Sequence, residues 1–167
     1  ICMVVGIDKF REYFADFPGS YIIIGGTACD IIIEEAGFTP QATKDFDIIL
    51  FVEVLSSDFI KLFGECVKEG DYGQQEKNPD ERKYYRFLKP ADSSFPKQVE
   101  LFSRIPDLLE LEEDAHLSPI PVDDDLSSLS AILMNEDYYR YTIENSYVKD
   151  WVHIASTSAL ICLKAKA

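Results

Sequence analysis

Basic side chains are scarce in this sequence, and their scarcity limits what the protein can bind. The 167 residues include 30 acidic side chains but only 16 lysines and arginines, which gives a formal net charge of −14. Such a charge repels nucleic acid and anionic membranes at long range and attracts cations, metal ions included. An acidic surface also keeps ordinary cytoplasmic proteins soluble, so the charge alone assigns no function.

Cysteine and histidine are also sparse, and neither is arranged as a metal site. The four cysteines are Cys2, Cys29, Cys66 and Cys162. None forms a CxxC pair and each lies among apolar residues, which favours buried free thiols in a reducing compartment over disulfides or zinc ligands. His116 and His153 lie far apart without a partner motif, so we expect structural or exposed roles for both.

Long apolar runs are absent as well. No stretch approaches the roughly 18 apolar residues of a membrane span, and the opening ICMVVG is too short and is followed by no cleavage signal. With 47% hydrophobic residues the chain is expected to build a globular core in the cytoplasm, with no membrane partner. The sequence begins with Ile1 and stops inside the helix-like SALICLKAKA, so we expect it to be part of a longer protein.

Apolar spacing and turn residues predict helices and strands that alternate along the chain. Helices are expected over 8–17, 27–37, 56–68, much of 126–145, and from 157 onward. Strands are expected over 20–26, 45–53, 82–90, 97–105 and 152–156, with a polar loop at 69–81 and a hairpin joining 82–90 to 97–105. This order predicts an α/β or α+β fold with a small mixed sheet flanked by helices.

The stretch TKDFDIIL places Asp45 and Asp47 at the start of an apolar strand pattern. Side chains alternate between the faces of a strand, so the two carboxylates are expected on one face, close enough to repel each other. A cation between such groups stabilises them, and Mg²⁺ is bound by carboxylates together with substrate phosphates. The alternative is a plain structural domain in which Asp-x-Asp only marks a strand entry.

A glycine turn precedes the two aspartates. SYIIIGG ends in Gly25 and Gly26, and Thr27 is expected to cap the helix that follows. Glycines let backbone N–H groups approach a bound group, and a helix N-terminus favours phosphate, although glycine is also ordinary in a strand-to-helix turn. Turn and aspartates together predict phosphate and carboxylates at one sheet edge, bridged by two Mg²⁺ ions.

The pattern GGTACDIIIEEAGFTPQATKDFDIIL resembles the signature of the DNA polymerase beta-type nucleotidyltransferase superfamily. GGTA and TKDFD are most similar to its bacterial AbiEii-like branch, which includes toxins of toxin–antitoxin and phage-defence systems. ALICLKAKA resembles the lysine-bearing helix of that branch. The resemblance covers most of 20–105 and part of 157–167. It implies a nucleotidyltransferase-like domain over 1–110 and a helical, incomplete C-terminal region over 111–167.

The resemblance also implies a third carboxylate on a later strand, and Glu100 in KQVELF is the best match, although Asp is common in the superfamily. A glutamate in an apolar strand is costly unless it is paired or metal-bound. The alternative is an edge strand with Glu100 facing water. Glu53 has the parity of the two aspartates but lies too far along its strand to join them.

Basic residues complete the implied site. Lys164 matches the phosphate-binding lysine of the branch, while Gly25, Gly26 and Thr27 would hold the β and γ phosphates. The single basic cluster is Arg82, Lys83, Arg86 and Lys89. This cluster would hold triphosphate or acceptor, or would simply balance the acidic excess at a solvated strand.

The implied reaction is Mg²⁺-dependent transfer of a nucleoside monophosphate from an NTP to an acceptor hydroxyl or phosphate, with release of pyrophosphate. Asp45 and Asp47 would bind metal, and Glu100 would bind the second ion and help to deprotonate the acceptor. The acceptor is an RNA end, a protein or a small molecule, and an antitoxin is the implied protein partner. The alternative is a nucleotidyltransferase-like binding module that acts through a partner without turnover.

Overall fold

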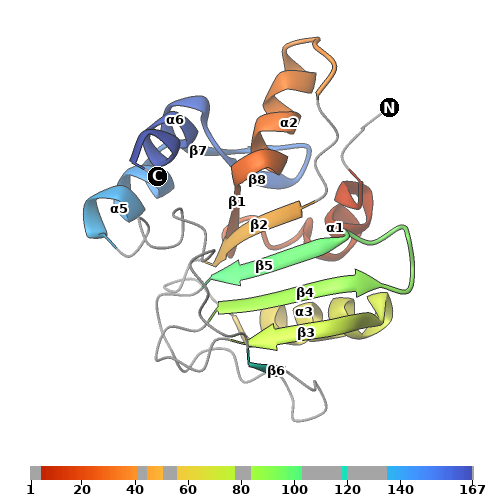
Figure 1. The fold of residues 1–167 in the computed structure, drawn as a ribbon. Helices are drawn as coiled ribbons and strands as arrows, with labels where there is room; N and C mark the ends of the chain where they lie inside the picture. Colours follow the sequence, from red (N-terminus) through yellow and green to blue (C-terminus); the bar gives the residue numbers. More distant parts are fainter. Residues whose placement is uncertain are drawn as a thin grey trace.

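The computed structural model describes residues 5–40, 45–50, 56–77, 84–102, 118–119 and 135–166. Side chains are described within 5–40, 56–73, 86–101 and 135–166. These residues form a mixed α+β fold in which helices pack on an eight-stranded sheet (Figure 1). Within them, no helix is both long and apolar enough to cross a bilayer.

The described helices are α1 (Ile7–Phe14), α2 (Gly25–Glu35), α3 (Ser57–Gly70), α5 (Glu136–Glu144) and α6 (Thr157–Lys166). The strands are β1 (Tyr21–Ile24), β2 (Asp45–Leu50), β3 (Tyr72–Lys77), β4 (Tyr84–Pro90), β5 (Gln98–Phe102), β6 (Ser118–Pro119), β7 (Ser146–Lys149) and β8 (Val152–Ala155). Their order across the sheet is β6-β3-β4-β5-β2-β1-β8-β7.

The sheet is mixed. Antiparallel pairs join β1 to β2, β3 to β4, β4 to β5 and β7 to β8. Parallel pairs join β2 to β5, β1 to β8 and β3 to β6. The central strands therefore come from distant parts of the chain, and β1 lies between β2 and β8.

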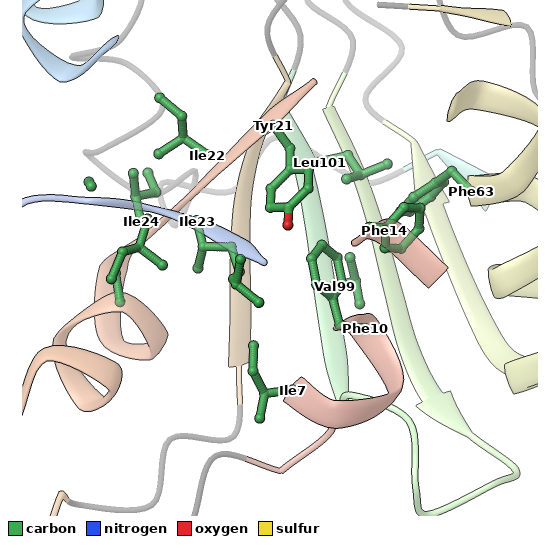
Figure 2. Close-up of a cluster of buried hydrophobic side chains, with 14 of the residues drawn as sticks. Ile7, Phe10, Phe14, Tyr21, Ile22, Ile23, Ile24, Phe63, Val99 and Leu101 are labelled. Atoms are coloured by element: carbon green, nitrogen blue, oxygen red, sulfur yellow. The ribbon is translucent and has the colours of Figure 1, made fainter. Parts of the chain in front are cut away.

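Aromatic side chains fill the core on the face covered by α1 and α3. Phe14 packs against Tyr21 and against Phe63 of α3, with ring centroids 6.3 Å and 5.9 Å apart. Tyr21, Val99 and Leu101 point from the sheet toward this cluster (Figure 2). α3 begins after Ser56, which caps the helix by accepting a hydrogen bond from the Phe59 backbone N–H.

The other three described helices, α2, α5 and α6, form a group beside β1 and β2. α2 contacts β1 and β2, α6 packs against α2, and α5 packs against α6 (Figure 1). Residues 146–155 add β7 and β8 to the sheet that residues 21–102 begin, so the C-terminal part of the chain supplies strands as well as helices.

Most of the predicted elements are present in the described ranges, including the antiparallel hairpin of β4 and β5. The loop predicted for 69–81 is wrong over 69–77, since α3 continues to Gly70 and β3 covers Tyr72–Lys77, and 78–81 lie outside the described residues. β7 and β6 were also missed. Thr27 does not cap α2, because the helix already begins at Gly25. The predicted helix over 126–145 is present from Glu136, and 126–134 lie outside the described residues.

Candidate functional site

The turn from β1 to α2 has the backbone that the glycines predicted. Gly25 has φ 74°, in the left-handed region where a residue with a Cβ is strained. Ile24 stands at the N-cap of α2, and its apolar side chain makes no capping hydrogen bond to the first N–H groups of the helix. Gly26 is exposed at this end of the helix. The turn thus offers backbone donors to an anion.

Strand register brings the predicted carboxylate positions to this turn. Asp47 of β2 pairs with Ile24 of β1 on one side and with Glu100 of β5 on the other. Asp45 pairs with Gln98 in the same way. Residues 45, 47 and 100 therefore occupy neighbouring positions of matching parity beside the residue that leads into Gly25. The side chains of Asp45 and Asp47 lie outside the described set.

Glu100 is buried, with 8% of its surface exposed. β5 lies between β4 and β2, so the alternative of a water-facing glutamate on an edge strand is wrong. Its Oε1 accepts hydrogen bonds from Arg86 Nε and from Gln98 Nε2, each at 2.8 Å. The register of the hairpin explains the ion pair, since Arg86 of β4 lies directly across from Glu100.

The structure gives less support to the two other residues predicted to contact phosphate, Thr27 and Lys164. Thr27 is fully buried, so a phosphate would reach its hydroxyl only if the atoms that cover it moved. Lys164 is exposed on α6 and lines an apolar groove with Cys29 and Ile32 of α2. Cys29 is one helical turn from Gly25, so Lys164 lies beside the helix body next to the turn. Both phosphate roles stay predictions.

The donor set suits a hard divalent cation. Mg²⁺ prefers carboxylate oxygens, and the register supplies three neighbouring carboxylate residues beside the glycine turn. Among the described side chains alone, no three His, Cys, Asp or Glu residues are grouped to hold a metal. The proposed set draws two of its members, Asp45 and Asp47, from outside those side chains. Glu53, Lys44, Arg82 and Lys83 also lie outside the described residues.

Sequence reasoning missed two features of this site. Gln98 shares the parity of Glu100 in KQVELF, and that alternation was a readable signal of a same-face partner. Arg86 was assigned to triphosphate or to solvent, whereas it forms the ion pair with Glu100. Comparisons with protein-family models, curated proteins and solved structures found no match to this chain.

Proposed function

We propose that this protein is a Mg²⁺-dependent nucleotidyltransferase with a polymerase beta-like site, possessing the toxin-like role that its resemblance to the AbiEii branch implies. The observation that carries the proposal is the position of Asp47, which pairs with Ile24 before the glycine turn and with Glu100 on the parallel strand. The backbone N–H groups that would bind phosphate and the carboxylate residues that would bind metal are thereby close together in the sheet.

Each residue has a distinct role in the proposed reaction. Gly25 and Gly26 hold the β and γ phosphates through backbone N–H groups, while Asp45 and Asp47 bind metal. Glu100 binds the second ion and helps to take the proton from the acceptor oxygen. That oxygen attacks the α-phosphorus, the bond to the bridging oxygen breaks, and pyrophosphate leaves. Bound magnesium would stabilise the negative charge on the attacking and leaving oxygens.

The acceptor is expected to contact the described residues at few points. Each phosphate contact of a long nucleic acid needs a basic group, and the net charge of −14 disfavours such binding. An RNA end, a protein hydroxyl or a small molecule fits this charge better than a long duplex. A steep salt dependence of tRNA or duplex binding by these residues would contradict that expectation.

A labelling experiment tests the proposed activity. The full chain is incubated with each α-labelled NTP, Mg²⁺ and total cell RNA or lysate, and the labelled product is identified. Asp47→Asn should abolish labelling without lowering thermal stability in the absence of metal, because it removes a crowded anion. Asp58→Asn, at an exposed position of α3, is the matched control and should label like wild type. Equal labelling by Asp47→Asn would overturn the proposal.

The ion pair between Arg86 and Glu100 supports a second candidate. Glu100 already has a cationic partner at 2.8 Å, so this part of the site is neutralised without metal. A binding module that holds nucleotide without turnover, and acts through an antitoxin-like partner, would not require Glu100 to bind a metal ion. Titration calorimetry showing NTP binding by a protein that labels no acceptor would favour this candidate over the enzyme.

A further inference from the structure

A cleft distinct from the nucleotide site lies at the far end of α2. Its volume is about 480 Å³, and its lining includes Arg11, Glu34, Glu35, Lys149, Asp150 and Trp151. Glu34 is nine residues beyond Gly25, which corresponds to roughly 14 Å along the helix at about 1.5 Å per residue. A ligand here would not occupy the proposed phosphate position.

The turn between β7 and β8 displays Trp151 at this cleft. Asp150 and Trp151 both have left-handed backbone angles, with φ 47° and 63°. Two-residue hairpin turns of this type normally use Asn or Gly, because a Cβ is strained there. Arg11 Nε donates to the Asp150 carbonyl at 2.8 Å, which holds the turn in place. Trp151 nevertheless remains 65% exposed, so the residue is accessible to a ligand.

The charged side chains that line the cleft include more carboxylates than cations. Arg11 is paired with Asp8 at 2.7 Å, and Lys149 is paired with Glu35 at 3.2 Å. Both cations of the lining therefore already have partners. The carboxylates of Glu34 and Asp150 make no ion pair with any side chain that the structure describes. An anionic ligand would meet these two groups unfavourably, whereas a cation would pair with them.

We propose that this cleft binds an arginine side chain from a basic segment of a partner protein. The guanidinium plane would stack on Trp151 while its N–H groups pair with Glu34 or Asp150. Arginine suits the cleft better than lysine, because a planar and weakly hydrated cation stacks on an aromatic face and forms forked hydrogen bonds. The net charge of −14 would also speed the approach of a basic segment. This cleft would bind such a segment whether or not the protein has the proposed transferase activity.

The single tryptophan provides the measurement, since Trp151 is the only one in the 167 residues. Hexa-arginine and hexa-lysine peptides are titrated separately into the full chain, with Trp151 fluorescence and calorimetry followed in parallel. We expect hexa-arginine to bind about fivefold more tightly than hexa-lysine and to change the fluorescence. Equal affinities, or calorimetric binding that leaves the fluorescence unchanged, would overturn the proposal.

Variants separate the cleft from general charge attraction. Glu34→Gln should weaken hexa-arginine binding about two- to fivefold, as expected for one partly exposed ion pair. Glu65→Gln removes an equal charge from an exposed position on α3 and should leave the affinity unchanged. Trp151→Ala, measured by calorimetry, should weaken binding about fivefold, and Trp151→Phe should recover part of it. Equal effects of Glu34→Gln and Glu65→Gln would show attraction to the whole acidic surface and would contradict the proposal.

Discussion

Replacing Arg86 with methionine isolates the buried charge of Glu100. Arg86 Nε and Glu100 Oε1 are 2.8 Å apart, and the two side chains are only 23% and 10% exposed. At this distance, with an effective dielectric constant of about 20, the attraction between unit charges is about 6 kcal/mol. The desolvation of both ions offsets much of it, so the intact pair contributes little net stability.

The single replacement is different, because it leaves Glu100 buried without its counter-ion. Breaking a buried pair in this way costs about 3–5 kcal/mol. We expect about 3 kcal/mol, since the Gln98 amide still donates to the carboxylate and Arg86 retains some exposure. For a protein of this size that loss lowers Tm by about 6–12 °C.

Urea unfolding followed by circular dichroism in metal-free buffer measures this loss. The double variant Arg86→Met/Glu100→Gln should recover most of it, because the second change removes the unpaired charge. Added Mg²⁺ should stabilise the single variant more than wild type if Glu100 binds metal as proposed. A single variant within about 0.5 kcal/mol of wild type would refute the buried-charge reasoning itself. If Arg86→Met is destabilised but added Mg²⁺ does not stabilise it, the result would instead count against metal binding by Glu100.

Three further outcomes are expected. Trp151→Gly should raise the free energy of unfolding by about 1 kcal/mol by relieving the left-handed strain, and an unchanged or lower urea midpoint would contradict this. Burial raises the pKa of the Cys66 thiol to about 12, so iodoacetamide at pH 8 should modify Cys162 well before Cys66. Mass spectrometry would follow both modifications, and equal rates would argue against the burial of Cys66. Burial lowers the pKa of His153 below its ordinary 6.5, so the unfolded chain binds the proton more readily than the folded protein does. The free energy of unfolding should therefore fall from pH 7.5 to pH 5. His153→Gln should flatten this dependence on pH, and an unchanged dependence would exclude His153 as its source.

Local patterns in the sequence indicated the residues of the proposed site, but they did not predict the order of strands in the sheet. The glycine turn, the Asp-x-Asp strand and the parity of Glu100 all follow from short-range rules. The parallel pairing of β2 with β5 does not, because it joins residues about fifty positions apart and leaves no local signal. The convergence of Asp47 with Glu100 was therefore a hypothesis drawn from resemblance until the register placed their backbones side by side.

β3 shows a different limit of sequence reasoning. Its residues, YGQQEK, are mostly polar and lack the apolar alternation by which strands are recognised. The strand is held by backbone pairing with β4 on one side and with β6 on the other. Such pairing depends on what lies next to the segment in space, so composition alone predicted a loop at 69–81.

The place of β8 in the sheet has a consequence for how the chain folds. β1 is fully buried and pairs on one side with β8, with Ile23 beside Ile154, across about 130 residues of sequence. During synthesis β1 and β2 emerge long before β8, so one edge of the most apolar strand stays unpaired until residues 152–155 appear. Contacts this distant slow folding, and an unpaired apolar edge invites association between chains. Nascent chains that stop before Val152 should therefore be the aggregation-prone species, and they would require chaperones until the late strand closes the sheet.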